Sequence, residues 1–174
     1  MSLILNIETA TGVCSVAVAK DGELLCIKES NLKNSHAEVL TNFIDEVLKT
    51  ANKSLSELDA IAVSEGPGSY TGLRIGVAAA KGLCFALEKQ LIGVSTLGAM
   101  AVGMVNSFSS AEKTNFLYCP MIDARRMEVY CAVFNEFGEE VRETRAEIIE
   151  ENSFQEFLGN NKVIFAFKVQ VKRN

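Results

Sequence analysis

The chain has 174 residues, of which 48% are hydrophobic and 22% are charged, so it can bury a core and lies near the size at which one domain gives way to two lobes. Its 22 acidic and 17 basic residues give a net charge of −5. This balance disfavours autonomous binding to nucleic acid, because a phosphate backbone rewards clustered Lys and Arg, and any such contact would need a partner's help.

Residues 2–30 are predicted to open the fold as a β-meander. Three β-type runs are separated by turn residues, and the last two flank Asp21-Gly22, which is a hairpin signal. The runs are Leu3–Ile7, Val13–Ala19 and Leu24–Lys28. Apolar residues then recur at steps of three and four between positions 40 and 51, which predicts an amphipathic helix. Ser35 and Glu38 fit a capping box at its start.

A Gly-rich turn at residues 66–68 connects a short apolar run at 60–63 to a second helix, predicted over residues 71–87. Arg74 and Lys81 are its only charged residues and lie on one face, so the rest of its circumference is apolar or small. We therefore expect this helix to be buried on more than one side.

The polar stretch at residues 106–115 is the best candidate for a boundary between lobes. We therefore assign residues 1–106 to an N-terminal lobe, ending in a strand at 91–94 and a helix at 95–105, and residues 107–174 to a partial C-terminal lobe. The second lobe is predicted to contain three strands, a short helix and a final strand, at residues 116–122, 129–135, 140–146, 153–158 and 163–167. The β-β-β-α-β order thus recurs, which predicts an α/β fold.

Two turns carry residues that could face a phosphate. The Gly-rich turn enters a helix N-terminus, where backbone N–H groups and the helix dipole favour an anion, although the glycines could equally make a tight turn and no Walker Lys-Ser/Thr follows. The turn after the first strand offers a carboxylate and hydroxyls that could face a nucleotide phosphate or its magnesium, and a plain polar turn explains it equally well. The candidates are Glu8, Thr9, Gly66, Gly68, Ser69 and Thr71.

Small residues recur at every fourth position of the second helix, at Gly72, Gly76 and Ala80. This stripe would let another backbone approach closely, either in tight packing on the sheet or against a helix of a partner. Because the other faces of the helix are also apolar, we favour one side on the sheet and another against a partner helix.

The sequence predicts no catalytic residue and no metal site. His36 is the only histidine, so a two-histidine metal site is excluded, and the chain has no Gly-x-Ser-x-Gly elbow. The five cysteines form an odd set without a Cys-x-x-Cys pair, and each lies in an apolar run, as expected for reduced packing residues. The first apolar stretch is too short for a signal sequence or a membrane span, so we expect a cytoplasmic protein that does not bind membranes.

Asp123, Arg125 and Arg126 lie between two predicted strands of the second lobe. The paired guanidinium groups could bind a carboxylate or a phosphate through forked hydrogen bonds. Taken alone, the segment is most simply a charged turn.

In order and spacing, five segments resemble the TsaB (YeaZ) family of tRNA threonylcarbamoyladenosine biosynthesis subunits, once grouped with the M22 peptidases. These segments are residues 4–11, 35–38, 66–76, 94–97 and 122–126. The Gly-Pro-Gly-Ser-Tyr-Thr-Gly-Leu-Arg-Ile-Gly block followed by Asp-Ala-Arg-Arg is specific, and it identifies the chain as a member. The resemblance implies an actin-like (ribonuclease H-like) fold of two lobes, with the second lobe truncated.

The resemblance also implies a scaffold subunit that is not an enzyme on its own. It would pair with the catalytic paralogue TsaD and work with the ATPase TsaE to place threonylcarbamoyl on the adenosine beside the tRNA anticodon. The first two helices would form the pairing surface, and the same surface would give a homodimer when the chain is alone. The contact residues expected are Val39, Phe43, Val47, Gly72, Gly76 and Ala80. No cofactor is expected on this chain, and ATP or ADP with magnesium would bind only within the partner complex.

Two features depart from the family pattern. Glu8 stands where most relatives carry Asp, which makes nucleotide binding at this turn less favourable. After Phe165 the chain differs from its relatives, as a truncation or a change of reading frame would explain, and an uncovered second lobe would favour self-association. The rival interpretations are an M22-type peptidase or glycoprotease, and an independent ATPase that uses Glu8, Gly68 and Ser69.

Overall fold

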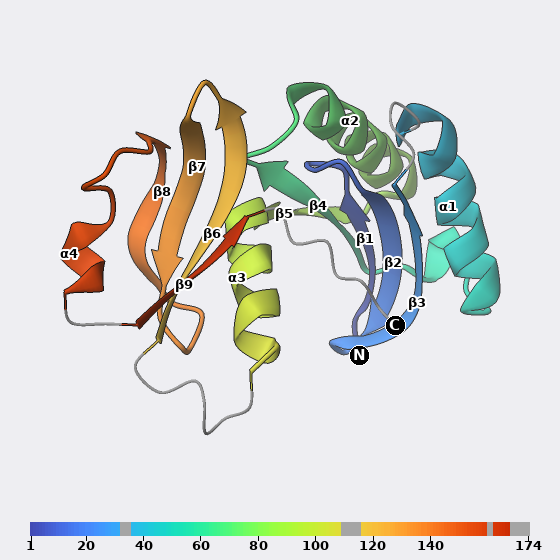
Figure 1. The fold of residues 1–174 in the computed structure, drawn as a ribbon. Helices are drawn as coiled ribbons and strands as arrows, with labels where there is room; N and C mark the ends of the chain where they lie inside the picture. The colour runs from blue at the N-terminus through green and yellow to red at the C-terminus, as the bar shows by residue number, and fades with distance from the viewer. Residues whose placement is uncertain (32–35, 109–115, 160–161, 168–174) are drawn as a thin grey trace. The chain divides into compact units, whose positions relative to one another are not determined.

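The computed structural model describes residues 1–31, 36–108, 116–159 and 162–167 (Figure 1). The chain divides into two compact units, Met1–Ser95 and Thr96–Asn174. Among the described residues, no helix has both the length and the apolar character needed to cross a membrane.

The first unit is a five-stranded sheet in the order β3-β2-β1-β4-β5. Strands β1 to β3 form an antiparallel meander, whereas β4 is parallel to β1 and β5 is parallel to β4. The strands are β1 (Leu3–Glu8), β2 (Cys14–Lys20), β3 (Glu23–Ser30), β4 (Ala60–Gly66) and β5 (Gln90–Ser95). The predicted hairpin is confirmed, since Asp21 and Gly22 have φ of 51° and 86° and fill a two-residue type I′ turn between β2 and β3.

Two helices, α1 (His36–Thr50) and α2 (Tyr70–Leu87), pack side by side on this sheet (Figure 1). Helix α1 contacts β2 and β3, and α2 contacts β4. The predicted apolar stripe of α1 is confirmed, because Leu40, Ile44 and Val47 are buried in the core of the unit.

Serine residues cap helix α2 and the 3₁₀ turn that follows α1. Ser69 caps α2 by accepting a hydrogen bond of 3.2 Å from the Gly72 N–H. The capping box expected at Ser35 lies outside the described residues. A capping box does occur between Ser54 and Glu57, around a 3₁₀ turn (Leu55–Glu57) that the sequence pattern does not indicate.

The second unit is a four-stranded sheet in the order β8-β7-β6-β9. The strands are β6 (Phe116–Arg125), β7 (Glu128–Phe134), β8 (Glu140–Ile148) and β9 (Lys162–Phe167), with helices α3 (Thr96–Asn106) and α4 (Gln155–Leu158). Helix α3 packs on β6 and β7, where Leu97, Ala101 and Met104 join a core with Tyr118. Its residues therefore group with the second sheet, and the division falls after Ser95 rather than after residue 106 as expected.

The two sheets share one topology. The order β8-β7-β6-β9 repeats β3-β2-β1-β4, including the parallel pairing of the central strand with its later neighbour. The recurrence of β-β-β-α-β is thereby confirmed. The first sheet, with its β3-β2-β1-β4-β5 order, has the actin-like arrangement that the resemblance implies.

Candidate functional site

The connection between β1 and β2 is held by its own side chains. One carboxylate oxygen of Glu8 accepts a hydrogen bond of 2.5 Å from the Ala10 N–H, and the other accepts one from the Ser64 hydroxyl on β4. Thr9 is fully buried, and its Oγ1 has no hydrogen-bond partner among the described residues. Glu8 thus links β1 to β4, and its role toward a phosphate or magnesium stays a prediction.

The Gly-rich turn packs directly on that connection. The Ser69 N–H donates a hydrogen bond of 2.6 Å to the Ala10 carbonyl oxygen. A Cβ atom on Gly68 would overlap the same oxygen, so a glycine is needed there for close approach. Tight packing therefore accounts for Gly68. A phosphate-facing role for the turn, including Gly66 and Thr71, remains a prediction.

The small-residue stripe of α2 faces inward. A Cβ on Gly72 would overlap the carbonyl oxygen of Thr9, and a Cβ on Gly76 would overlap the Thr9 hydroxyl. Ala80 is likewise fully buried. The alternative that the sequence leaves open, tight packing on the sheet, accounts for these three residues.

The three predicted contact residues of the first helix differ in burial. Val47 is fully buried, and Val39 and Phe43 are partly buried against the core of the unit. Since Val47 and the α2 stripe are interior residues, they offer no surface to a partner. Val39 and Phe43 keep part of their surface exposed, and their role in pairing stays a prediction.

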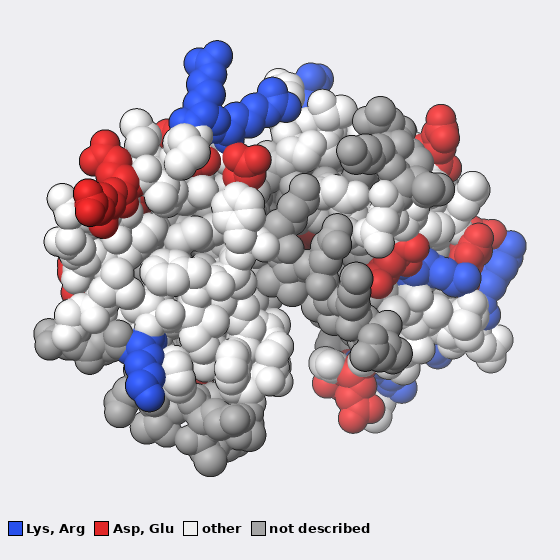
Figure 2. Space-filling model, in the orientation of Figure 1, with Lys and Arg blue, Asp and Glu red and all other residues white. Residues whose placement is uncertain are grey.

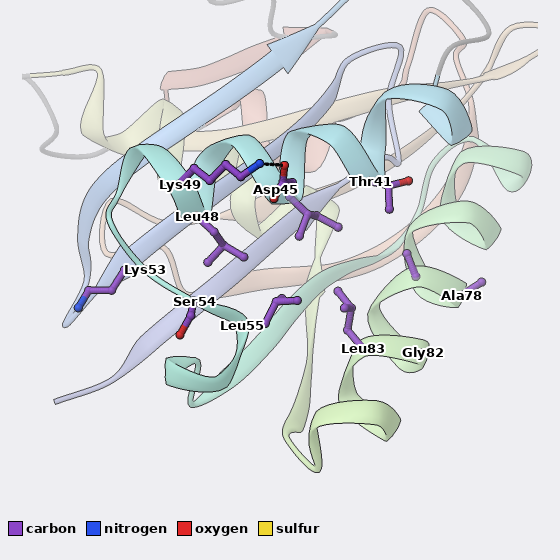
Figure 3. Close-up of a pocket in the computed structure, with 12 residues that line it drawn as sticks. Thr41, Asp45, Leu48, Lys49, Lys53, Ser54, Leu55, Ala78, Gly82 and Leu83 are labelled. Atoms are coloured by element: carbon purple, nitrogen blue, oxygen red, sulfur yellow. Dashed lines mark hydrogen bonds and ion pairs between the residues drawn. The ribbon is translucent and has the colours of Figure 1, made fainter.

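A groove of about 560 Å³ lies between α1, α2 and the 3₁₀ turn (Figure 3). Leu48, Leu55 and Leu83 point toward one another across it. An exposed ion pair between Asp45 and Lys49, 2.5 Å apart, lies on its rim. The groove is lined by Thr41, Ile44, Asp45, Leu48, Lys49, Lys53, Ser54, Leu55, Ala78, Ala79, Gly82 and Leu83.

The outer side of α2 also presents two aromatic rings. Phe85 is 89% exposed and Tyr70 is 75% exposed, with the Arg74 guanidinium carbon 5.4 Å from the Tyr70 ring centroid. The apolar sequence of α2 does not single out Phe85 as an exposed residue. A signal was nevertheless present, because Arg74 and Lys81 mark the solvent side of the helix and Phe85 follows Lys81 by one turn. We refer to the groove together with Tyr70 and Phe85 as the α1–α2 surface.

The segment Asp123–Arg126 forms the tip of the β6–β7 hairpin. Arg125, Arg126 and Met127 have φ of 71°, 55° and 63°, and all three are exposed. The Arg125 N–H donates a hydrogen bond of 2.7 Å to the Asp123 carboxylate. Figure 2 shows basic side chains projecting from this end of the second unit. The three motif residues are thus brought together at a turn.

No group of three metal-ligating side chains is found within the described residues. Burial, with the Glu8 carboxylate nearby, raises the pKa of the Cys14 thiol. A hydrogen bond with Cys131, together with burial, raises the pKa of the Cys119 thiol. Raised pKa values keep both thiols protonated, which does not suit a nucleophile. The side chain of His36 is outside the described part of the chain.

Comparisons with known proteins give a consistent result. The family model for TsaD, tRNA N6-adenosine threonylcarbamoyltransferase, matches residues 28–162. The chain is 40% identical over 136 residues to the tRNA threonylcarbamoyladenosine biosynthesis protein TsaB of Escherichia coli (strain K12), covering 75% of this chain and 54% of that protein. The protein of the same description from Haemophilus influenzae is 36% identical over 142 residues, covering 78% of this chain and 58% of that protein.

A solved structure supports the same family assignment. YeaZ from Pseudomonas aeruginosa superposes with a TM-score of 0.70 at 31% identity, covering 86% of this chain and 68% of that one. The chain spans just over half the length of the two curated relatives described above.

Proposed function

The chain belongs to the TsaB (YeaZ) family, and from that premise we propose that it is a non-catalytic scaffold subunit that pairs with TsaD. The pair, assisted by the ATPase TsaE, would transfer threonylcarbamoyl to the adenosine beside the anticodon of tRNA in the cytoplasm. Any adenine nucleotide with magnesium would bind within this complex. The contribution of the chain is to bind and position its partner.

The observation that supports pairing is the exposure of Phe85 and Tyr70 beside the groove of the α1–α2 surface. An aromatic side chain that is 89% exposed, beside a groove with leucines on its floor, is typical of a surface that a partner covers. Burying Phe85 would contribute roughly 1.5–3 kcal/mol to association. A partner that offers an amphipathic helix fits a groove between two helices. In the absence of TsaD, a second copy of the chain would cover the same surface and form a two-fold dimer.

The test is the mass by light scattering of the chain mixed with TsaD, for the natural sequence and for Phe85→Asp. Placing a carboxylate at the interface should weaken association by about tenfold or more, since 1.4 kcal/mol corresponds to tenfold. Phe137→Asp is the matched control, because Phe137 is 78% exposed and belongs to the second unit. Equal complex formation by the Phe85 and Phe137 variants would show that the α1–α2 surface is not the pairing surface.

The two enzyme alternatives are not favoured, and each has a direct assay. A peptidase would cleave unfolded substrate when incubated with metal ions, and an independent ATPase would bind nucleotide in a titration of the chain alone. The raised pKa of the Cys14 and Cys119 thiols does not favour a thiolate nucleophile at these two positions.

A further inference from the structure

The tip of the β6–β7 hairpin has an unusual backbone for its residue types. Arg125 pairs with Glu128, so Arg126 and Met127 fill a two-residue turn in which both have positive φ. Such a turn favours Asn-Gly or Asp-Gly, and the β2–β3 turn of the same chain uses Asp21-Gly22. Side chains held in this region despite the steric cost are concentrated at functional sites. Glycine would adopt this turn with less backbone strain, yet the chain carries Arg126 and Met127 there.

The two guanidinium groups of this tip are available for a ligand. Arg125 and Arg126 make no ion pair with any described residue, and both are exposed. Other arginines of the unit are used differently, since Arg142 and Arg145 both pair with Glu147. The backbone N–H of Arg125 is held by Asp123, which fixes the turn while leaving the guanidinium free.

We infer that this tip, Arg125 and Arg126 with the exposed Met127, contacts the phosphate backbone of the tRNA while the partner subunit holds the RNA. The inference rests on the proposed function. Two adjacent arginines on a convex turn suit consecutive phosphates of a strand, which side chains reach from outside. The net charge of −5 repels RNA from the rest of the chain, so the contact is local, and without the partner it would be measurable only at low salt.

The test measures tRNA binding by the complex of this chain with TsaD at several salt concentrations. Arg125→Gln with Arg126→Gln removes two phosphate contacts, so the slope of log affinity against log salt should fall by about 1 to 2. The matched control is Lys20→Gln with Lys89→Gln, which removes the same charge from the first unit and should leave the slope unchanged. An unchanged slope in the arginine variant overturns the inference.

A second variant separates phosphate from carboxylate. Arg125→Lys with Arg126→Lys should keep the salt slope, because lysine binds phosphate as a point charge but cannot reproduce a forked contact with a carboxylate. If the glutamine variant instead lowers the mass of the TsaD complex, the tip contacts protein and the inference fails. Added ADP with magnesium that displaces tRNA from the natural complex, but not from the glutamine variant, would assign the tip to nucleotide and also overturn it.

The proposed function can fail separately. If the natural chain forms no complex with TsaD, the scaffold proposal fails, and the same titration is made on the chain alone at low salt. There the variant with Arg125→Gln and Arg126→Gln should bind tRNA more weakly than the control with Lys20→Gln and Lys89→Gln. Equal binding by the two variants overturns the inference.

Discussion

The β1–β2 connection and the β6–β7 turn hold the same place in the strand order of the two units, yet one is enclosed and the other is exposed. In the β1–β2 connection, Thr9 is fully buried beneath Gly76 of α2, and the Glu8 carboxylate accepts a hydrogen bond from the Ser64 hydroxyl. In the second, Met127 is 71% exposed beside two arginines. The strand order alone therefore does not decide what a hairpin connection does.

The neighbours of each connection explain the difference. Helix α2 carries glycines where it meets Thr9, so the connection and the helix pack without a gap. At the β6–β7 tip, the Arg125 N–H donates a hydrogen bond to the Asp123 carboxylate, and the Met127 carbonyl oxygen accepts one from the Ile149 N–H. Its side chains remain in solvent. The first connection is a packing element, and the second is suited to binding.

The largest effect is expected from breaking the enclosed connection with Gly76→Leu. If Gly76 lay in a pairing surface, as the resemblance implies, this change would block pairing and leave the fold intact. The structure predicts instead a loss of about 3 kcal/mol or more in the free energy of unfolding, because even a Cβ would overlap the Thr9 hydroxyl. Urea unfolding of the chain alone measures it.

Gly82→Ala is the control for that change on the same helix. A Cβ at Gly82 meets no atom within 4 Å, so alanine should raise stability by about 0.5–1 kcal/mol through its higher helix propensity. A Gly76→Leu variant as stable as the natural chain would contradict the enclosed packing of Thr9.

A smaller effect is expected from Ser64→Ala. Ser64 is only 5% exposed, and its hydroxyl donates a hydrogen bond to the Glu8 carboxylate. Removing the hydroxyl leaves that carboxylate oxygen without this donor. The cost should be about 1–3 kcal/mol. In a double-mutant cycle, the same change made in a Glu8→Gln background should cost less. Equal costs in both backgrounds would mean that the two side chains do not interact in solution.

Most of the fold could be predicted from the sequence, because its periodicity and turn residues are clear. Each helix and strand seen in the described residues corresponds to a predicted one, and Asp21-Gly22 fixes the β2–β3 turn. The short 3₁₀ turn at Leu55–Glu57 carries too few residues to show a period. The division after Ser95 depends on which sheet α3 packs against, a long-range contact that local pattern does not contain.

The site was harder to predict for a physical reason. Helix α2 is apolar or small on nearly every side, so no hydrophobic period distinguishes its buried stripe at Gly76 from its exposed side at Phe85. The resemblance predicts that the first two helices form the pairing surface, whereas the burial of the α2 stripe follows from its packing on Thr9. The turn at Arg126 and Met127 lacks the Asn-Gly signal, so its left-handed backbone was not indicated either.

The smallest effect is expected at the exposed tip, from Met127→Gly. Glycine adopts the φ of 63° without the steric cost that a side chain incurs, so stability should rise by about 1 kcal/mol. The converse change, Gly22→Ala in the β2–β3 turn, should lower stability by a similar amount, because Gly22 has φ of 86° and its Cβ would meet no atom within 4 Å. Thermal unfolding of both variants measures these shifts. If Met127→Gly destabilises the chain, Met127 makes a contact that outweighs the backbone strain, and the tip is then held by packing in the same way as the β1–β2 connection.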